Sequence, residues 1–418
     1  MFNQGMTVPD GDDALLDRRT WFSWVRSGLG GAALTTLLAR DGLVRADRVR
    51  GEASDPPPHH PAKAKRVLHI VLCGGMSHID TFDYKPSLEK FHGKQLLSSE
   101  RPETFFGQVG LLRQSDWKFR RHGKSGLWMS ELFPHMAGVI DELTFVYSMA
   151  ADSANHTPAT FQEITGFRFN GYPSMGAWLS YGMGSETEEL PAYVVLPDAR
   201  GLPAGSTINW SSGFLPARHQ GVAFRTQGAV IEDLVPAQKI DDKTERDSRE
   251  ILAALNQRHL ERVGENDRLA ARIKSYELAA RMQLAVPRVT DLSRETAQTR
   301  RHYGLEGKDT EAFGRSCLLA RRLLEQGVRF VQVFSGGSFG SPRINWDGHE
   351  DMRENHGNEA RRIDQPVAAL IRDLRQRGML DDTLVLFTKD RCAMRQNCEK
   401  KKAASKRQVI KPQHALRA

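Results

Sequence analysis

The stretch VLHIVLC at 67–73, followed at once by Gly74-Gly75, decides the fold of this chain. Six of its seven residues are apolar, and the two glycines allow a sharp turn, so it predicts a strand buried on both faces that ends abruptly. Comparable apolar runs are TFVYS at 144–148, YVVLP at 193–197, VRFVQVF at 328–334 and TLVLFT at 383–388. Continuous apolar runs of this length are typical of a parallel sheet covered on both faces.

Helical patterns lie between these runs. Ile251, Leu252 and Leu255 begin a helix, and its spacing continues through Leu269, Ile273 and Tyr276. A further helical stripe, ended by Gly378, consists of Ile363, Val367, Leu370, Ile371 and Leu374. Strands that alternate with helices predict an α/β fold built on a doubly wound, mostly parallel sheet. In such sheets the loops after the carboxyl ends of the strands carry the chemistry, so we expect the functional residues there.

Length, composition and charge restrict the class of protein. The chain has 418 residues, of which 26% are charged and 39% hydrophobic, which excludes a collagen-like, disulfide-dense or generally disordered protein. No apolar run is long enough for a stable membrane span. The net charge of +8 lies in residues 391–418, which hold nine basic residues, one acidic residue and no aromatic residue for stacking on bases. We therefore expect a basic, disordered tail on a neutral body and no nucleic-acid partner.

The first 65 residues are predicted to contain an export signal followed by a linker. Arg18-Arg19 precede an uncharged, weakly apolar stretch, so residues 1–50 resemble a twin-arginine (Tat) export signal. The alternative, an amphipathic helix, is disfavoured by Gly30-Gly31. This signal predicts passage through the Tat machinery to the periplasm or another extracytoplasmic site in bacteria. The proline-rich residues 51–65 predict a linker, and the folded domain is expected over 66–390.

Three polar segments follow predicted strands. Past the first strand lie Ser77, His78, Asp80 and Asp83, which supply a hydroxyl, an imidazole and two carboxylates. The alternative interpretation of this segment is a glycine-rich turn with side-chain capping.

A second segment, at 152–160, contains His156, a candidate metal ligand or acid/base. Asn155 or Thr157 is predicted to cap a helix with Pro158 at its first position. Because helix starts bind anions through free N–H groups, Asn155 is also a candidate substrate-binding residue.

The third segment, Asn345-Trp-Asp-Gly-His349, follows the strand at 328–334, and His356 lies nearby. The Asp-x-His spacing of Asp347 and His349 lets a carboxylate and an imidazole reach one divalent cation. The alternative is a solvated polar loop. The four cysteines suggest no metal knuckle, and Cys73 and Cys317 are expected to be buried thiols.

These segments together resemble the alkaline phosphatase/sulfatase-like superfamily and, within it, the bacterial proteins with domain of unknown function 1501, over residues 66–388. The matching stretches are Gly74-Gly75-x-Ser77-His78-x-Asp80-Thr-Phe-Asp83-x-Lys85-Pro86, 173–182, 209–216 and Trp346-Asp347-x-His349. The resemblance implies an exported, sulfatase-like, metal-dependent hydrolase of sulfate or phosphate esters, acting on a small molecule or a polysaccharide. It further implies a divalent ion, zinc or calcium, with Asp80, Asp347 and His349 as ligands. Ser77 and His78 are then expected to bind substrate, with His156 near the reacting group.

The chain departs from true sulfatases at three places. Their formylglycine cysteine falls on His156 and their arginine on Thr160, which leaves Thr157 or a metal-activated water as the nucleophile. Their Asp-Asp metal pair falls on Gly74-Gly75. After residue 388 the relatives continue with an acidic residue, for which Asp390 can substitute, and then an Asp-His pair. We therefore expect a truncated or frameshifted C-terminus, a sheet incomplete at that end, and impaired catalysis.

A different class of function remains open at this point. A non-catalytic extracytoplasmic binding protein for anionic polysaccharide would use Trp178, Trp210 and Trp346 as stacking surfaces, although core packing is the commoner role of any one tryptophan.

Overall fold

The computed structural model describes residues 62–96, 110–149, 151–153, 155–231, 234, 241–264, 267–337, 343–349 and 351–390. From Lys63 onward these residues belong to one compact unit. The predicted export signal, most of the proline-rich linker and the basic tail lie outside the described residues.

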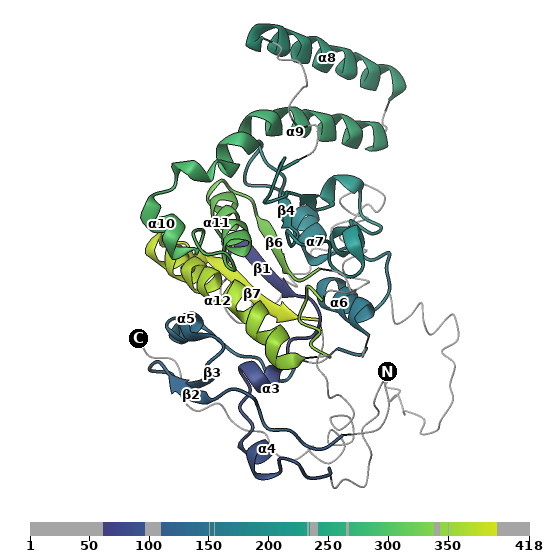
Figure 1. Ribbon diagram of the computed structural model, residues 1–418. Helices are drawn as coiled ribbons and strands as arrows, with labels where there is room; N and C mark the ends of the chain where they lie inside the picture. Colours follow the sequence, from purple (N-terminus) through teal and green to yellow (C-terminus); the bar gives the residue numbers. More distant parts are fainter. Residues whose placement is uncertain are drawn as a thin grey trace, which may run out of the picture. The chain divides into compact units, whose positions relative to one another are not determined.

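Five parallel strands form the central sheet, in the order β5-β4-β6-β1-β7 (Figure 1). The strands are β1 (Arg66–Leu72), β4 (Tyr193–Leu196), β5 (Val222–Ala223), β6 (Phe330–Ser335) and β7 (Thr383–Lys389). The apolar runs predicted as strands at 67–73, 193–197, 328–334 and 383–388 are therefore confirmed. β1 pairs with β6 on one side and with β7 on the other, so the carboxyl ends of these three strands meet at one edge.

The strand predicted at 144–148 is wrong. The segment is irregular and follows the 3-10 helix η1 (Ile140–Glu142). Phe145 packs on Phe82 with ring centroids 5.3 Å apart, whereas Val146 and Tyr147 are exposed. The segment therefore buries only part of its apolar surface, against another ring instead of inside the sheet, and an apolar run without a neighbouring strand forms no ladder.

Helices cover both faces of the sheet. Along β1, alternate residues point to opposite sides, because side chains of a strand alternate. Leu68, Ile70 and Leu72 pack with α11 (Glu311–Glu325) and α12 (Met352–Gln376). On the other face, Val71 and Cys73 lie in a smaller cluster with residues of α6 (His156–Thr165) and α7 (Met175–Met183). The fold is thus mixed α/β with a buried parallel sheet, as the sequence predicts.

The two helical stripes behave differently. The stripe from Ile363 to Leu374 is the buried face of α12, and Gly378 follows in the left-handed region at φ +67°, as predicted. The stripe that begins at Ile251 is not one helix but two, α8 (Asp242–Val263) and α9 (Asp267–Thr290), separated after Val263 by Gly264 at φ +77°. Ile251, Leu252 and Leu255 of α8 are exposed, since α8 lies beyond α9 and does not cover the sheet (Figure 1).

Shorter elements connect these parts. They are α3 (His78–Thr81), α4 (Pro86–Lys90), β2 (Phe119–His122), β3 (Leu127–Ser130), α5 (Pro134–Ala137), η2 (Ser206–Trp210), η3 (Ala217–His219), η4 (Leu292–Arg294), α10 (Ala297–His302) and η5 (Leu380–Asp382). β2 and β3 pair as a separate antiparallel ribbon. Cys73 and Cys317 are buried free thiols, as predicted. Over the described residues, no helix has the length and apolar character needed to cross a membrane.

Candidate metal centre at the carboxyl edge of the sheet

Gly74 lets the loop after β6 lie directly on the end of β1. Its φ is +102°, and a Cβ at this position would lie 2.6 Å from the Asp347 nitrogen and 2.7 Å from the Trp346 nitrogen. The Trp346 N–H donates to the carbonyl of Cys73 at 2.8 Å. Only glycine combines this backbone conformation with so close an approach, so Gly74 brings Asp347 to the strand end.

Asp390 joins three elements at the same edge. It follows β7 directly, and its side chain is fully buried. Its Oδ2 accepts hydrogen bonds from the Gly74 N–H at 2.8 Å and from the Thr160 hydroxyl at 3.3 Å. Its Oδ1 lies 3.4 Å from Nδ1 of His156. The carboxylate is thus held in one orientation by β1 and α6.

The start of α6 places His156 over this carboxylate. Asn155 is the N-cap, and its side chain accepts from the Thr157 N–H at 3.3 Å. The capping prediction is confirmed for Asn155 and wrong for Thr157, which lies in the first turn, and Pro158 is the third helical residue, not the first. One turn further, Thr160 donates its hydroxyl to the His156 carbonyl and to Asp390, at 2.8 and 3.3 Å.

His156, Asp347 and His349 converge on one point. One ligand atom from each lies within 4.8 Å of the others. Oδ1 of Asp347 is 2.9 Å from Nε2 of His349 and 3.8 Å from Nε2 of His156. The other oxygen of Asp347, Oδ2, accepts a hydrogen bond from Arg343, so Oδ1 is the one turned to both imidazoles.

The geometry of this group fits a divalent cation. Ligands about 2.0–2.1 Å from a tetrahedral zinc are roughly 3.3 Å apart, and the two measured separations lie on either side of that value. Asp390 beside Nδ1 of His156 favours the tautomer that donates from Nδ1, which leaves the lone pair of Nε2 directed at Asp347. A carboxylate behind a histidine is the usual way to orient a metal-binding imidazole.

Ser77, His78 and Asp80 lie beside this group but are not part of it. The Ser77 hydroxyl donates to Oδ2 of Asp80 at 2.5 Å, an interaction within α3 and its cap. Nζ of Lys389 lies 3.3 Å from Nδ1 of His78. Burial and then the Lys389 charge lower the pKa of His78 to about 4, so its ring is neutral at pH 7. The roles of these three residues in metal or substrate binding stay predictions.

His356 serves the fold at this edge. It is buried, its Nε2 accepts from the Ser77 N–H at 2.9 Å, and its Nδ1 lies 3.1 Å from the side-chain oxygen of Asn355. Burial, followed by Lys389, lowers its pKa to about 4. Neutral His356 uses both ring nitrogens in polar contacts, and its contact with Ser77 connects α12 to the turn after β1.

Cys73 is no nucleophile here, because burial and then the Asp390 charge raise the pKa of its thiol well above the usual range. Sequence reasoning marked Thr160 only as the position of the missing sulfatase arginine, and it indicated no role for Arg343. Each lies four positions from a residue that it did identify, His156 and Asp347 respectively, and that spacing is the only local signal for them.

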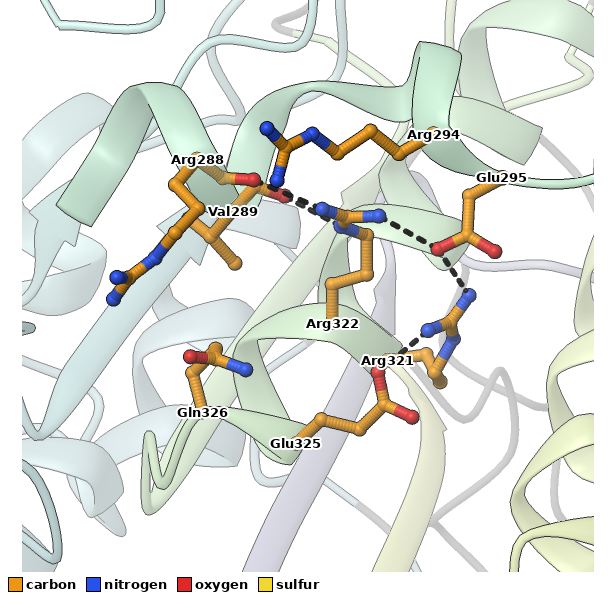
Figure 2. Close-up of a pocket in the computed structure, with 8 residues that line it drawn as sticks. All are labelled: Arg288, Val289, Arg294, Glu295, Arg321, Arg322, Glu325 and Gln326. Atoms are coloured by element: carbon orange, nitrogen blue, oxygen red, sulfur yellow. Dashed lines mark hydrogen bonds and ion pairs between the residues drawn. The ribbon is translucent and has the colours of Figure 1, made fainter.

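A cavity of about 290 Å³ lies at the other edge of the sheet, where α11 ends before β6 begins. Its lining residues are Arg288, Val289, Arg294, Glu295, Arg321, Arg322, Glu325 and Gln326. In Figure 2, Arg321 and Arg322 point toward Glu295, and Arg321 also meets Glu325, whereas Arg288 points away from both glutamates. Arg321, which is buried, lies 2.8 Å from Glu295, 2.5 Å from Glu325 and 3.1 Å from Asp373. This cavity is lined by mutual ion pairs.

No curated protein matches the sequence, and no solved structure does. A family match covers residues 64–390, which includes the whole parallel sheet and every residue of the candidate metal centre. The chain belongs to the family described as protein of unknown function (DUF1501).

Proposed function

We propose that this protein is a metal-dependent hydrolase of sulfate or phosphate esters, with a divalent cation held by His156, Asp347 and His349. The proposal rests on one observation, the convergence of these three ligand atoms at the carboxyl edge of a parallel sheet. Asp390 beside Nδ1 of His156 supports it, since a carboxylate in that position is the usual orienting partner of a metal-binding imidazole.

Zinc suits the donor set better than calcium. Two imidazoles and one carboxylate are the ligands of zinc and related transition metals. Calcium takes six to eight ligands, almost all of them oxygens, and so would leave the imidazoles without a role. Three protein ligands leave a fourth position for water or substrate, as in catalytic zinc sites.

The surrounding residues suit an anionic ester. A bound divalent ion supplies a Lewis acid for the ester oxygen and lowers the pKa of an attacking water. Arg343, beside Asp347, and the positive end of the α6 dipole favour a negatively charged group nearby. Asn155, Ser77 and His78 are proposed to contact the substrate, and Thr157 in the first turn of α6 is the alternative nucleophile. Asp80 accepts from the Ser77 hydroxyl and is not among the three metal ligands of this proposal.

The wider assignment is also a proposal. Candidate ligands that follow β6, at the carboxyl ends of parallel strands, support an alkaline phosphatase-like fold and a sulfatase-like activity. The twin-arginine sequence supports export to an extracytoplasmic compartment. The impairment expected from the sequence depends on residues after 390, outside the described part of the chain.

Metal content and ester turnover test the proposal together. The full chain is purified without chelators, its bound metal is measured, and hydrolysis of aryl sulfates and aryl phosphates is followed. We expect stoichiometric zinc and, because catalysis is expected to be impaired, only weak turnover. Both should be lost in Asp347→Ala and retained in the control Asp381→Asn, an exposed acid on η5. Equal zinc binding by wild type and Asp347→Ala would refute the site. Zinc without turnover would refute only the reaction.

A second candidate function, binding of anionic polysaccharide without catalysis, is favoured by the exposure of Trp178. Trp210 and Trp346 are buried in the core, so the prediction of three stacking tryptophans reduces to one. A protein that holds no zinc and turns over no ester, yet is retained on a sulfated polysaccharide, would favour this second function.

A further inference from the structure

Six rings make an unbroken chain of contacts beyond the C-terminal end of α6. Phe167 stacks on Tyr172 with centroids 3.8 Å apart, and Tyr172 meets Phe214 edge to face at 6.5 Å. Trp178 contacts Phe214 and Tyr181 at 5.7 and 6.3 Å, and Tyr181 contacts His219 at 5.2 Å. We call these six residues the aromatic chain.

The aromatic chain is built on a fixed backbone. The Ser174 N–H and its hydroxyl both donate to the Ser211 carbonyl, each at 3.2 Å, which joins the two segments that carry the rings. Gly213 has φ +54°, and a Cβ there would lie 2.5 Å from the Pro173 nitrogen. At the far end, Nδ1 of His219 lies 3.0 Å from the Ser180 hydroxyl. The rings are therefore held in position before any ligand arrives.

Much of this surface is open. Phe214 is 65% exposed, Phe167 49% and Trp178 39%, and the neighbouring Phe169 and Met183 are exposed as well. Isolated exposed apolar residues are ordinary, but contiguous aromatic surface of this kind on a soluble domain marks a binding site.

Charge restricts what binds there. Residues 164–185 and 201–231, which carry the aromatic chain, contain no Asp or Glu, although the whole chain has 51. They carry the exposed Arg168 and Arg218. Arg168 lies over the Phe169 ring at 5.9 Å, and Arg218 donates to Nε2 of His219 at 3.1 Å. The occupant is therefore anionic and has apolar faces.

We infer that the aromatic chain binds an anionic polysaccharide. A sugar ring offers a C–H face to an aromatic ring and hydroxyl groups at its rim, and sulfate or carboxylate substituents pair with arginine. Tyr172, Tyr181 and His219 add polar edges to the more apolar rings, which suits that mixture better than the acyl chains of a membrane. Trp178 meets Phe214 and Tyr181 at 73° and 83°, so these rings face different directions.

The inference deepens the proposed function by naming a polymeric substrate, and only its link to hydrolysis rests on that function. α6 has ten residues, so His156 at its start and Phe167 just past its end are separated by roughly 15 Å of helix. A polymer, unlike a small ester, is long enough to contact both ends.

Affinity electrophoresis of the full chain tests the binding. Gels contain dextran sulfate, uncharged dextran or no polymer, and EDTA keeps the metal centre out of the comparison. We expect retardation by dextran sulfate, weakened about tenfold in Trp178→Ala/Phe214→Ala, the loss typical of a central aromatic contact. Tyr276→Ala on α9, another exposed aromatic, is the matched control and should bind as wild type does. The basic residues of 391–418 are present in every variant, so they cannot produce a difference.

Further measurements separate the other outcomes. Arg168→Gln/Arg218→Gln should weaken binding and reduce its dependence on salt. Tryptophan fluorescence should change when soluble dextran sulfate is added, because Trp178 lies in the binding surface. This change should be absent in Trp178→Phe. The single variant keeps the binding testable if the double variant folds poorly. Equal binding by wild type and Trp178→Ala/Phe214→Ala, or loss only of binding to anionic phospholipid vesicles or to single-stranded DNA, would overturn the inference. Asp347→Ala should keep full binding, so failure of the metal proposal and failure of this one are distinguishable.

Discussion

The two edges of the parallel sheet both gather charged side chains, but in opposite ways. At the amino edge, Arg321 has three carboxylates around it, and Arg377 pairs with two of the same three, Glu325 and Asp373. At the carboxyl edge, the carboxylate of Asp347 faces two imidazoles, and a second carboxylate, Asp390, lies behind one of them. The first cluster pairs buried arginines with carboxylates, whereas the second brings one carboxylate and two imidazoles within 4.8 Å of one another.

The way in which the charged groups are paired distinguishes a structural cluster from a candidate functional site better than cavity volume does. The cavity at the amino edge measures about 290 Å³, yet its buried cations are already neutralised by their neighbours. Binding a ligand there would require breaking ion pairs in a poorly solvated site. At the carboxyl edge a cation would relieve the mutual repulsion of its ligands. We therefore expect the amino edge to stabilise the fold, and we propose the carboxyl edge as the functional site.

Arg321→Ala should have the largest effect on stability. It removes the cation shared by Glu295, Glu325 and Asp373. Each carboxylate keeps a second cation, Arg322 or Arg377, so we expect a loss of about 3 kcal/mol, the low end of the cost of breaking a buried pair. Urea denaturation measures the loss in unfolding free energy. The exposed Arg294→Ala, on the rim of the same cavity, should change it by less than about 0.5 kcal/mol. If both variants were equally mild, the amino edge would not be a stabilising network.

His356 should make the stability of the carboxyl edge depend on pH. Its pKa is about 4 in the folded protein and near 6.5 when unfolded, so the unfolded chain binds more protons between these values. Stability is therefore full above pH 6.5 and falls as the pH drops toward 4, by about 3 kcal/mol from this residue alone. In His356→Gln, whose side-chain oxygen also accepts from Ser77, this part of the slope should vanish.

The amino edge gives the internal contrast for that experiment. Burial opposes charge on Glu295, but hydrogen bonds from Arg322 and Arg321 lower its pKa overall. The pKa of Arg321 is raised by its carboxylate partners despite burial. Removal of an arginine side chain adds or removes no group that titrates between pH 4 and 6.5, so the slope of Arg294→Ala should equal that of wild type. An unchanged slope in His356→Gln would contradict the assignment.

Asp390→Asn should weaken zinc binding without removing a ligand. The amide can still accept from Gly74, but its orienting charge behind His156 is lost, and such changes cost about 10–100-fold in metal affinity. Competition with a chelating dye measures the affinity, and Asp381→Asn serves as the matched exposed control. An affinity unchanged in Asp390→Asn would mean that this carboxylate does not support the metal centre.

The smallest effect is expected from anions at the amino edge. Inorganic sulfate should shift the Tm of wild type by less than about 1 °C, because the arginines there are already paired and a ligand stabilises only what it binds. The measurement is thermal denaturation of wild type and of Arg294→Ala. Each protein is compared in sulfate and in a chloride control of equal ionic strength. A sulfate-specific rise lost in Arg294→Ala would reverse the roles of the two edges.

Most of the sheet could be predicted from the sequence, because strands buried on both faces require continuous apolar runs. The same rule failed at 144–148, where Phe145 finds a ring partner instead of a neighbouring strand. The apolar stripe of α8 lies on a helix, as predicted, but it is exposed. Periodicity indicates which side of a helix is apolar but not what covers it. The metal group was only partly predictable. Asp347 and His349 are neighbours in sequence, whereas Asp390 and His156 are 234 positions apart.

The sequence by itself determined most local elements: four of the five apolar strands, a helix start capped by Asn155 or Thr157, the buried stripe of α12 and the glycine turn after β1. These are encoded within a few residues, through side-chain burial and backbone freedom. Only the tertiary structure decided which polar residues meet. The carboxyl ends of β1, β6 and β7 come together through pairing over long sequence distances, and Gly74 then lets the Asp347 loop approach within reach of α6. That convergence follows from packing, which no local pattern records.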